Sequence, residues 1–238
     1  MSQAGAEPHD IARYFRPTST LAIFVIAGLA IISVLNGVSL VGGLIAMRGV
    51  GVFGGTRDND IISLSMLVYG LAALAQILVF VPTVVLFCIW TFRSAVNART
   101  LGARGFRITP GWAVGWYFIP VATLWMPFKA MSEIWRASIH PIKGDDRTAW
   151  RNAPVGVLLQ AWWTSWVLGT LVTNIASRFF DEPSFERIGA WMISIGAGLQ
   201  ILAGVLCIAV VSRLTTSQRR RAADARTMLA ATSALPAS

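Results

Sequence analysis

Four long runs of this 238-residue chain contain no charged residue, and they constrain its fold more than any other feature. The runs cover about 20–47, 61–92, 155–177 and 188–212. Each is long enough to cross a hydrocarbon core as a helix, which takes roughly 20 residues. The short segments of alternating polarity that are typical of membrane β-barrels do not occur in the sequence. We therefore predict an all-α polytopic membrane protein with four transmembrane helices.

The composition supports this class of protein. Hydrophobic residues make up 55% of the chain and charged residues 13%, whereas soluble domains carry about 25% charged residues. The first apolar run is longer than the apolar core of a signal peptide, so we expect a membrane anchor there and no cleavable signal. Cys88 and Cys207 lie inside apolar runs, where thiols behave as small hydrophobic groups. The sequence therefore predicts neither a disulfide nor a zinc site.

An apolar segment that is broken by prolines lies between the second and third runs. Pro120 and Pro127 leave no uninterrupted apolar stretch of spanning length within 110–136, because proline lacks an N–H and breaks or kinks a helix. From Pro127 onward, apolar and charged residues fall on two different helical faces, which is typical of a helix lying in the membrane interface. We predict that 110–139 is a re-entrant or interfacial segment. The alternative is a kinked fifth span, since membrane helices tolerate proline.

The distribution of Lys and Arg favours four spans over five. If 110–139 does not cross the membrane, 16 of the 20 Lys and Arg lie on the side of the termini, and four lie in the loops 48–60 and 178–187. Positive residues of short loops gather on the cytoplasmic side. We therefore predict two helical hairpins with both termini in the cytoplasm. The predicted parts are a cytoplasmic N-terminal segment 1–19, a membrane domain 20–212 and a basic cytoplasmic tail 213–238.

Several short-range signals predict local structure around these spans. The run Asp58-Asn59-Asp60 at the end of the loop 48–60 offers a plausible N-cap for the second span. Asn97 follows that span and is expected to bond backbone groups freed at its end. Gly102 suits a helix end or a turn with positive φ. Gly111 and Gly115 have the spacing that permits close approach of another helix.

A dense motif of aromatic, proline and polar residues runs from the second apolar run into the broken segment. Its members are Trp90, Asn97, Gly102, Pro110, Trp112, Trp116, Pro120, Leu124, Pro127, Glu133, Trp135 and Arg136. The motif resembles the core of an uncharacterised bacterial membrane family, domain-of-unknown-function family 4328, over about 75–215. The resemblance implies an integral protein of the bacterial cytoplasmic (inner) membrane. It implies no activity, cofactor or catalytic residue.

The sequence predicts neither catalysis nor a bound cofactor. Motifs such as HExxH, GxSxG and the P-loop do not occur in it, and His9 and His140 share no ligand spacing with other residues. Glu133 stands on one helical face with Lys129 and Arg136. This group predicts either a solvated charge cluster or a carboxylate that faces a cytoplasmic vestibule and binds a cation or a proton.

Two classes of function therefore stay open. The predicted role is structural, as an interaction protein or accessory subunit with other membrane proteins or further copies as partners. The alternative is a small-solute or ion transporter or channel that uses the broken helix 110–136. The net charge of +9 lies next to the spans, which favours contacts with the bilayer and its anionic headgroups over nucleic acid. We predict that Arg219, Arg220 and Arg221 contact anionic lipid.

Overall fold

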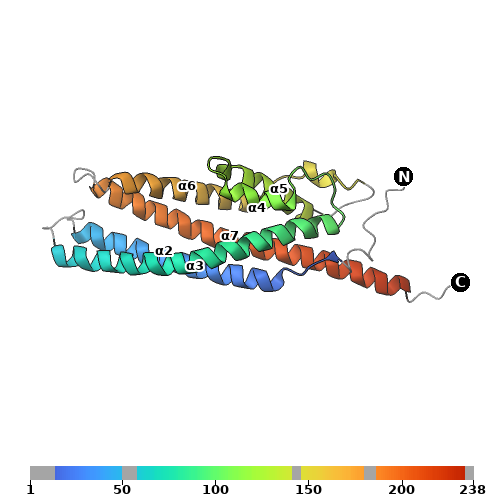
Figure 1. The fold of residues 1–238 in the computed structure, drawn as a ribbon, viewed down its shortest axis with the longest axis horizontal. Coiled ribbons are helices and arrows are strands. Elements are labelled where there is room, and N and C mark those ends of the chain that lie inside the picture. The colour runs from blue at the N-terminus through green and yellow to red at the C-terminus, as the bar shows by residue number, and fades with distance from the viewer. Residues whose placement is uncertain (1–13, 50–57, 141–145, 180–185, 234–238) are drawn as a thin grey trace. The chain divides into compact units, whose positions relative to one another are not determined.

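The computed structural model describes residues 14–49, 58–140, 146–179 and 186–233, and these residues form an all-α fold without any strand. The four long helices are α2 (Ser19–Gly49), α3 (Asn59–Thr100), α6 (Val157–Phe179) and α7 (Glu186–Ser233) (Figure 1). Each of them covers one predicted apolar run. The elements between α3 and α6 are α4 (Pro110–Gly115), α5 (Met126–Ile139) and the 3-10 turns Trp116–Phe118, Ala122–Leu124 and Ala149–Asn152.

Some of the sequence predictions fall outside the described residues. These are His9, most of the N-terminal segment 1–19, the central parts of the loops 48–60 and 178–187, and the end of the tail. The start of the second span is described. Asp58 Oδ1 accepts hydrogen bonds from the backbone N–H of Asp60 (3.0 Å) and of Ile61 (3.1 Å). The predicted N-cap is therefore confirmed.

The contacts divide the chain into two units. Unit 1 comprises Met1–Phe24, Val85–Gly156 and Val210–Ser238, and unit 2 comprises Val25–Val84 and Val157–Ala209. Both α3 and α7 contribute to both units, because they are longer than the predicted spans. With 42 and 48 residues they extend about 63 and 72 Å, about twice the roughly 30 Å of a hydrocarbon core.

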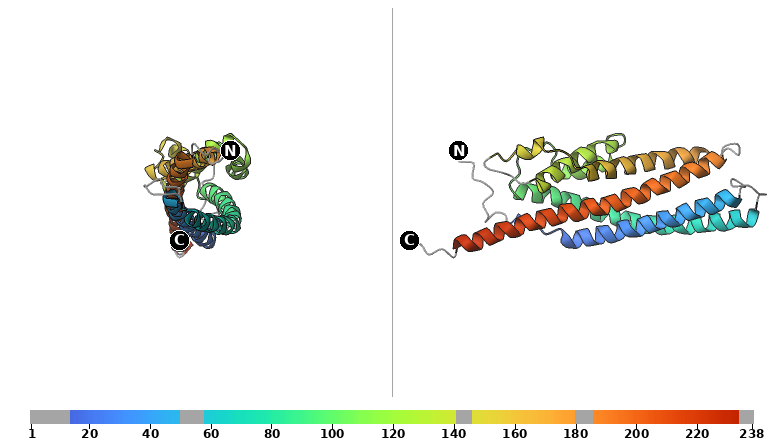
Figure 2. Two further views of the ribbon diagram at one scale, coloured as in Figure 1. Left: turned by 90° about the vertical axis from the view of Figure 1, so that its left-hand side faces the viewer. Right: turned by 180° about the vertical axis from the view of Figure 1, so that it is seen from behind.

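Unit 2 consists of two antiparallel hairpins, α2 with the first half of α3 and α6 with the first half of α7 (Figures 1 and 2). Glycines allow the helices to approach closely. A Cβ at Gly28 would overlap the side chain of Thr83, and one at Gly204 would overlap Ser33. Gln200 Nε2 donates to Thr170 Oγ1 across the α6–α7 pair at 3.1 Å. Small residues and polar bonds of this kind are typical of helix contacts in membranes.

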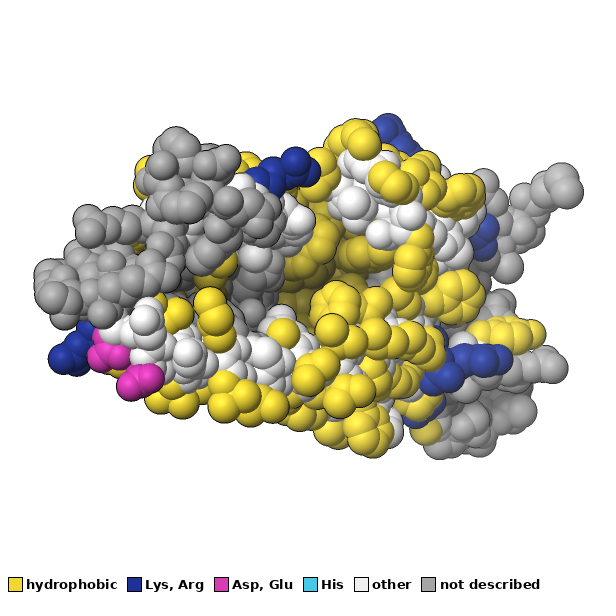
Figure 3. Space-filling view, turned by 60° about the vertical axis from the view of Figure 1, so that its left-hand side comes forward, with side chains coloured by type: hydrophobic (Ala, Val, Ile, Leu, Met, Phe, Trp, Pro, Cys, Tyr) yellow, Lys and Arg dark blue, Asp and Glu magenta, His cyan; other side chains and the backbone are white. Residues whose placement is uncertain are grey.

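Within the described residues, three helices are long and apolar enough to cross a membrane, judged by length and composition. They are Ser19–Ile45, Asn59–Thr100 and Trp191–Met228. The helix α6 covers the remaining predicted span and has 23 residues, but its Trp, Thr and Gln residues lower its mean hydropathy. Large apolar side chains along α3 are between 57% and 75% exposed, namely Leu64, Met66, Leu67, Leu71, Leu74, Ile77, Leu78 and Val81. Apolar side chains also form a broad band over the described surface in Figure 3.

The segment between α4 and α5 is broken at Pro120. Pro120 follows Ile119, which has an extended backbone, and precedes Val121, whose φ is +67°. Pro127 lies in the first turn of α5, where the missing N–H costs no helical hydrogen bond. The predicted interruption is thus confirmed for Pro120. Pro127 lies at the predicted start of the amphipathic helix, and α5 begins there, at Met126.

The helix α5 is amphipathic, as predicted, and its apolar face is covered by protein. Met131, Ile134 and Trp135 are at most 4% exposed. The exposed apolar residues of this region lie in the broken segment before α5, where Phe118 is 69% and Val121 66% exposed. Whether 110–139 is re-entrant, interfacial or a fifth span depends on its position in the bilayer, so that placement stays a prediction.

Candidate functional site

Two buried polar side chains of α3 connect distant parts of unit 1. Trp90 is fully buried, and its Nε1 donates to Thr215 Oγ1 of α7 at 3.0 Å. Asn97 is also fully buried; its Oδ1 accepts the N–H of Arg16 (3.1 Å) and its Nδ2 donates to the carbonyl of Arg16 (2.8 Å). Asn97 thus bonds backbone groups, but they belong to the segment before α2 and not, as predicted, to the end of its own helix. The helix α3 continues past Asn97 to Thr100.

Gln218 of α7 connects α3 with α5. Its side chain is fully buried, and Nε2 donates both to the carbonyl of Ser94 (2.9 Å) and to Ser138 Oγ (2.8 Å). The neighbouring Ser217 donates from Oγ to the carbonyl of Ser138 at 2.7 Å. Sequence reasoning missed these residues, because they lie in a stretch that looks like a solvated basic tail.

Arg221 stabilises the C-terminus of α5. Its guanidinium donates to the carbonyl oxygens of Ala137 (2.7 Å), Ser138 (3.2 Å) and His140 (3.2 Å). The last carbonyls of a helix have no partner within the helix, and a cation there also interacts favourably with the helix dipole. The structure thus assigns this arginine a contact within the protein, whereas Arg219 and Arg220 are exposed.

The helix α3 ends in a Schellman motif. Gly102 has a φ of +95°, and its N–H donates to the carbonyl of Arg99 at 2.9 Å. The N–H of Ala103 donates to the carbonyl of Ala98 at 3.3 Å. This pair of bonds with a left-handed glycine is the usual form of the motif. The prediction of a helix end at Gly102 is therefore confirmed.

The loop after α3 is held by aromatic and cationic contacts. The Arg99 guanidinium donates to the carbonyl of Ile108 at 2.6 Å and lies 4.0 Å from the centroid of the Phe106 ring. The Phe106 ring lies 4.7 Å from that of Trp150, centroid to centroid. Trp150 Nε1 in turn donates to the carbonyl of Arg104 at 3.0 Å. These contacts connect the end of α3 to the turn before α6.

Glu133 anchors the same loop. Its carboxylate accepts the backbone N–H of Arg107 (3.1 Å) and of Ile108 (3.2 Å). Arg136 donates from Nη1 to the carbonyl of Arg151 at 3.1 Å. Both charged side chains therefore hold backbone groups in place. This arrangement favours a structural role for Glu133 over cation or proton binding.

The remaining motif residues shape α4 and its surroundings. Pro110 begins α4, and Thr109 is the N-cap, accepting the N–H of Trp112 at 3.3 Å. The rings of Trp112 and Trp116 lie 4.7 Å apart, centroid to centroid. Leu124 is 37% exposed in the second 3-10 turn, and Trp135 is buried next to Gly156, where an added Cβ would lie 3.1 Å from the indole nitrogen.

The close helix approach predicted for Gly111 and Gly115 is wrong. An added Cβ at Gly111 would meet no heavy atom within 4 Å. At Gly115 the nearest atoms belong to Trp112 of the same helix. Gly111 instead lines a cavity. The spacing alone could not show this, because glycine also occurs where a cavity wall is open.

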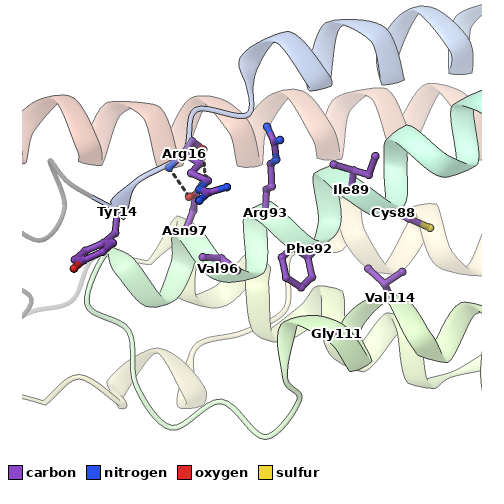
Figure 4. Close-up of a pocket in the computed structure, with 10 residues that line it drawn as sticks. All are labelled: Tyr14, Arg16, Cys88, Ile89, Phe92, Arg93, Val96, Asn97, Gly111 and Val114. Atoms are coloured by element: carbon purple, nitrogen blue, oxygen red, sulfur yellow. Dashed lines mark hydrogen bonds between the residues drawn. The ribbon is translucent and has the colours of Figure 1, made fainter.

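Of the cavities that adjoin α4 within the described part of unit 1, two are lined largely by apolar side chains. The α3–α4 cavity of about 660 Å³ is drawn in Figure 4 and is lined by Tyr14, Arg16, Cys88, Ile89, Phe92, Arg93, Val96, Asn97, Gly111 and Val114. The α4–α5 cavity of about 590 Å³ is lined by Arg107, Ile108, Thr109, Trp112, Trp116, Met126, Phe128, Lys129, Ser132, Glu133, Arg136 and Val155. Both combine apolar walls with cationic side chains. Such walls are suited to bind an amphipathic anion.

The described residues offer little for metal or thiol chemistry. No group of three His, Cys, Asp or Glu side chains among them is placed to hold a metal ion. Cys88 and Cys207 are free thiols, half-buried and buried respectively.

Comparison with known proteins identifies the family. The family model described as "Domain of unknown function (DUF4328)" matches residues 55–216. No curated protein and no solved structure matches the chain. The matched range includes the whole motif from Trp90 to Arg136, which carries the resemblance seen in the sequence. The chain therefore belongs to the DUF4328 family.

Proposed function

We propose that this chain is a four-span protein of the bacterial cytoplasmic membrane with a structural role, as an interaction protein or accessory subunit. The observation that carries the proposal is how unit 1 uses its polar groups. Asn97, Gln218, Arg221 and Glu133 all bind backbone or side-chain groups of the protein itself. Such a region is built to hold a defined surface.

The membrane topology rests on helix length, apolar exposure and charge. The helices α2, α3 and α7 meet the length and hydropathy needed to span, and α6 pairs with α7 in unit 2. Lys and Arg are concentrated in 93–154 and near the termini, the distribution expected for cytoplasmic segments. The exposed side chains of Phe118, Val121 and Trp125 support a segment that dips into the bilayer at the break.

Transport is the weaker alternative. Ion and proton pathways usually contain ionisable groups at membrane depth, and the four predicted spans contain no charged residue. One of the neutral amides, Gln200, is already engaged with Thr170. The broken helix supports transport only by its shape, since a broken helix can expose backbone groups to a substrate.

Cysteine labelling tests the topology. In a variant with Cys88→Ala and Cys207→Ala, single cysteines at Arg104 and Asn152 flank the broken segment, and both native residues are exposed. We expect a membrane-impermeant maleimide to label neither position until the cytoplasmic membrane is opened. A cysteine at Phe53, in the first predicted outer loop, is the control and should be labelled in intact cells. If Arg104→Cys and Asn152→Cys react from opposite sides, 110–139 crosses the membrane and the four-span topology is wrong.

The structural role is tested by the mass of the native complex and by solute flux. The protein is extracted with an amphipathic polymer that keeps the surrounding lipid, and native mass spectrometry measures the mass of the complex. We expect this 25.7 kDa chain to be part of a complex with a defined, larger protein mass. Liposomes containing the purified protein should show no ion or small-solute flux above empty liposomes. A monomer that conducts a solute, with conduction altered by Gln200→Leu, would contradict the role and favour transport.

A further inference from the structure

The α4–α5 cavity is lined by three residues that each carry a buried hydrogen-bond donor without a partner. These donors are Trp116 Nε1, Ser132 Oγ and Arg136 Nε, and none of them has a partner among the described residues. Ser132 as a whole is only 6% exposed. Buried polar atoms are nearly always hydrogen-bonded in folded proteins. Indole and guanidinium N–H groups only donate, and a hydroxyl can donate, so acceptor oxygens are the chemical match for these donors once side-chain adjustment brings them into contact.

The charge of the cavity also favours an anion. Arg107, Lys129 and Arg136 line it, and Glu133 is the one acidic residue in its described lining. The Glu133 carboxylate already accepts two backbone N–H groups of the loop. Arg107 and Lys129 are exposed at their heads. Charge-assisted bonds to phosphate oxygens are among the strong hydrogen bonds of proteins.

The opposite part of the lining is apolar. Trp112 and Trp116 present paired rings 4.7 Å apart, and Met126 and Phe128 add further apolar surface. The volume of about 590 Å³ lies in the range of ligand pockets, roughly 300–1,000 Å³. A free inorganic anion would leave this apolar wall unused. The lining therefore matches a molecule with an anionic head and an apolar tail.

We propose that the α4–α5 cavity binds an anionic phospholipid, with the phosphate at Arg107, Lys129, Ser132 and Arg136 and an acyl chain against the tryptophan rings. Two sources share this phosphate chemistry, a lipid headgroup and a soluble phosphate compound. The exposed apolar break that directly follows α4, with Phe118 and Val121, favours the lipid. The α3–α4 cavity is also cationic, through Arg16 and Arg93, but its lining contains none of the unpartnered donors.

Lipid retention by the full-length protein tests this site. The protein purified in a non-ionic detergent is titrated with phosphatidylglycerol, phosphatidylcholine or glycerol phosphate, and native mass spectrometry counts the bound molecules. We expect one phosphatidylglycerol per chain, bound at least about tenfold more tightly than phosphatidylcholine, because both carry the phosphate but the choline cation of the second is repelled by Arg107 and Lys129. Glycerol phosphate should not displace it. The double variant Arg107→Gln with Lys129→Gln should weaken binding by about tenfold or more, and Ser132→Ala should weaken it further.

A matched variant separates a specific site from general charge. The double variant Arg219→Gln with Arg220→Gln also removes two positive charges, but from exposed positions outside the cavity. It should retain the bound lipid. Equal weakening by both double variants, or equal binding of the two lipids, would overturn the proposal. Displacement of the lipid by glycerol phosphate at similar concentration would assign the site to a soluble anion and overturn the assignment to a lipid.

Thermal unfolding of each variant is recorded, and a variant with an unchanged unfolding midpoint is a valid test. Four-span topology is not required, so failure here leaves the proposed function intact.

Discussion

Replacing Trp90 by alanine is expected to destabilise unit 1 by about 3–5 kcal/mol, the usual cost of truncating a buried aromatic residue to alanine. Trp90 is fully buried, packs 5.6 Å from the Phe87 ring, centroid to centroid, and donates to Thr215. The substitution therefore removes ring contacts and a bond between α3 and α7 together. Thermal unfolding of the purified protein, followed by intrinsic fluorescence and by circular dichroism, should show a much lower midpoint.

The variant Trp90→Phe separates the two contributions. It keeps an aromatic ring near Phe87, loses the indole N–H, which corresponds to about 1 kcal/mol for one neutral hydrogen bond, and loses part of the buried ring volume, which adds a smaller cavity cost than truncation to alanine does. Its midpoint should lie much closer to that of the wild type than to that of Trp90→Ala. If Trp90→Ala unfolds at the wild-type midpoint, the interior around α3 and α7 is not packed as described.

Replacing Arg221 by methionine is expected to release the C-terminus of α5. Methionine preserves much of the apolar stem and removes the three bonds to the carbonyls of Ala137, Ser138 and His140. Bonds that involve a charged donor are worth about 1.5–3 kcal/mol. Because Arg221 is only half-buried, we expect the lower part of this range. Amide hydrogen exchange in the last turn of α5 should become about tenfold faster.

The neighbouring substitution Arg220→Met is the control. Arg220 is exposed and belongs to the same run of arginines. Its substitution therefore removes one positive charge without removing a bond to α5. Exchange in α5 should be unchanged in this variant. Equal acceleration in both variants would mean that net charge, and not the contact at the helix end, protects α5.

Local sequence signals predicted those parts of the fold that depend on neighbouring residues. The position of each long helix follows from the apolar runs, since a backbone in lipid must satisfy its own hydrogen bonds. The break at Pro120 and the left-handed conformation of Gly102 follow from the chemistry of proline and glycine. The N-cap at Asp58 follows from the preference of a carboxylate for the first free N–H groups. All of these act within a few residues.

The contacts of the site act over long separations, and the sequence could not predict them. Asn97 and Arg16 are 81 residues apart, and Gln218 reaches Ser94 across 124 residues. No local pattern shows which distant groups will meet. The run of arginines at 219–221 also looked uniform, although one of its members turns toward α5 and two stay exposed. Three adjacent positions on a helix face different directions, and only the packing decides which one meets a carbonyl.

The composition of unit 1 has a consequence for biosynthesis. Hydrogen bonds from Thr215, Gln218 and Arg221 complete unit 1. These three residues are translated after all of the residues to which they are bonded. Until then Trp90 and Ser94 lack these hydrogen-bond partners, so the interior of unit 1 stays incomplete in the nascent chain. Cellular proteases and chaperones act on chains with unsatisfied interiors. Translation of the second half of α7 is thus the step that completes these hydrogen bonds of unit 1.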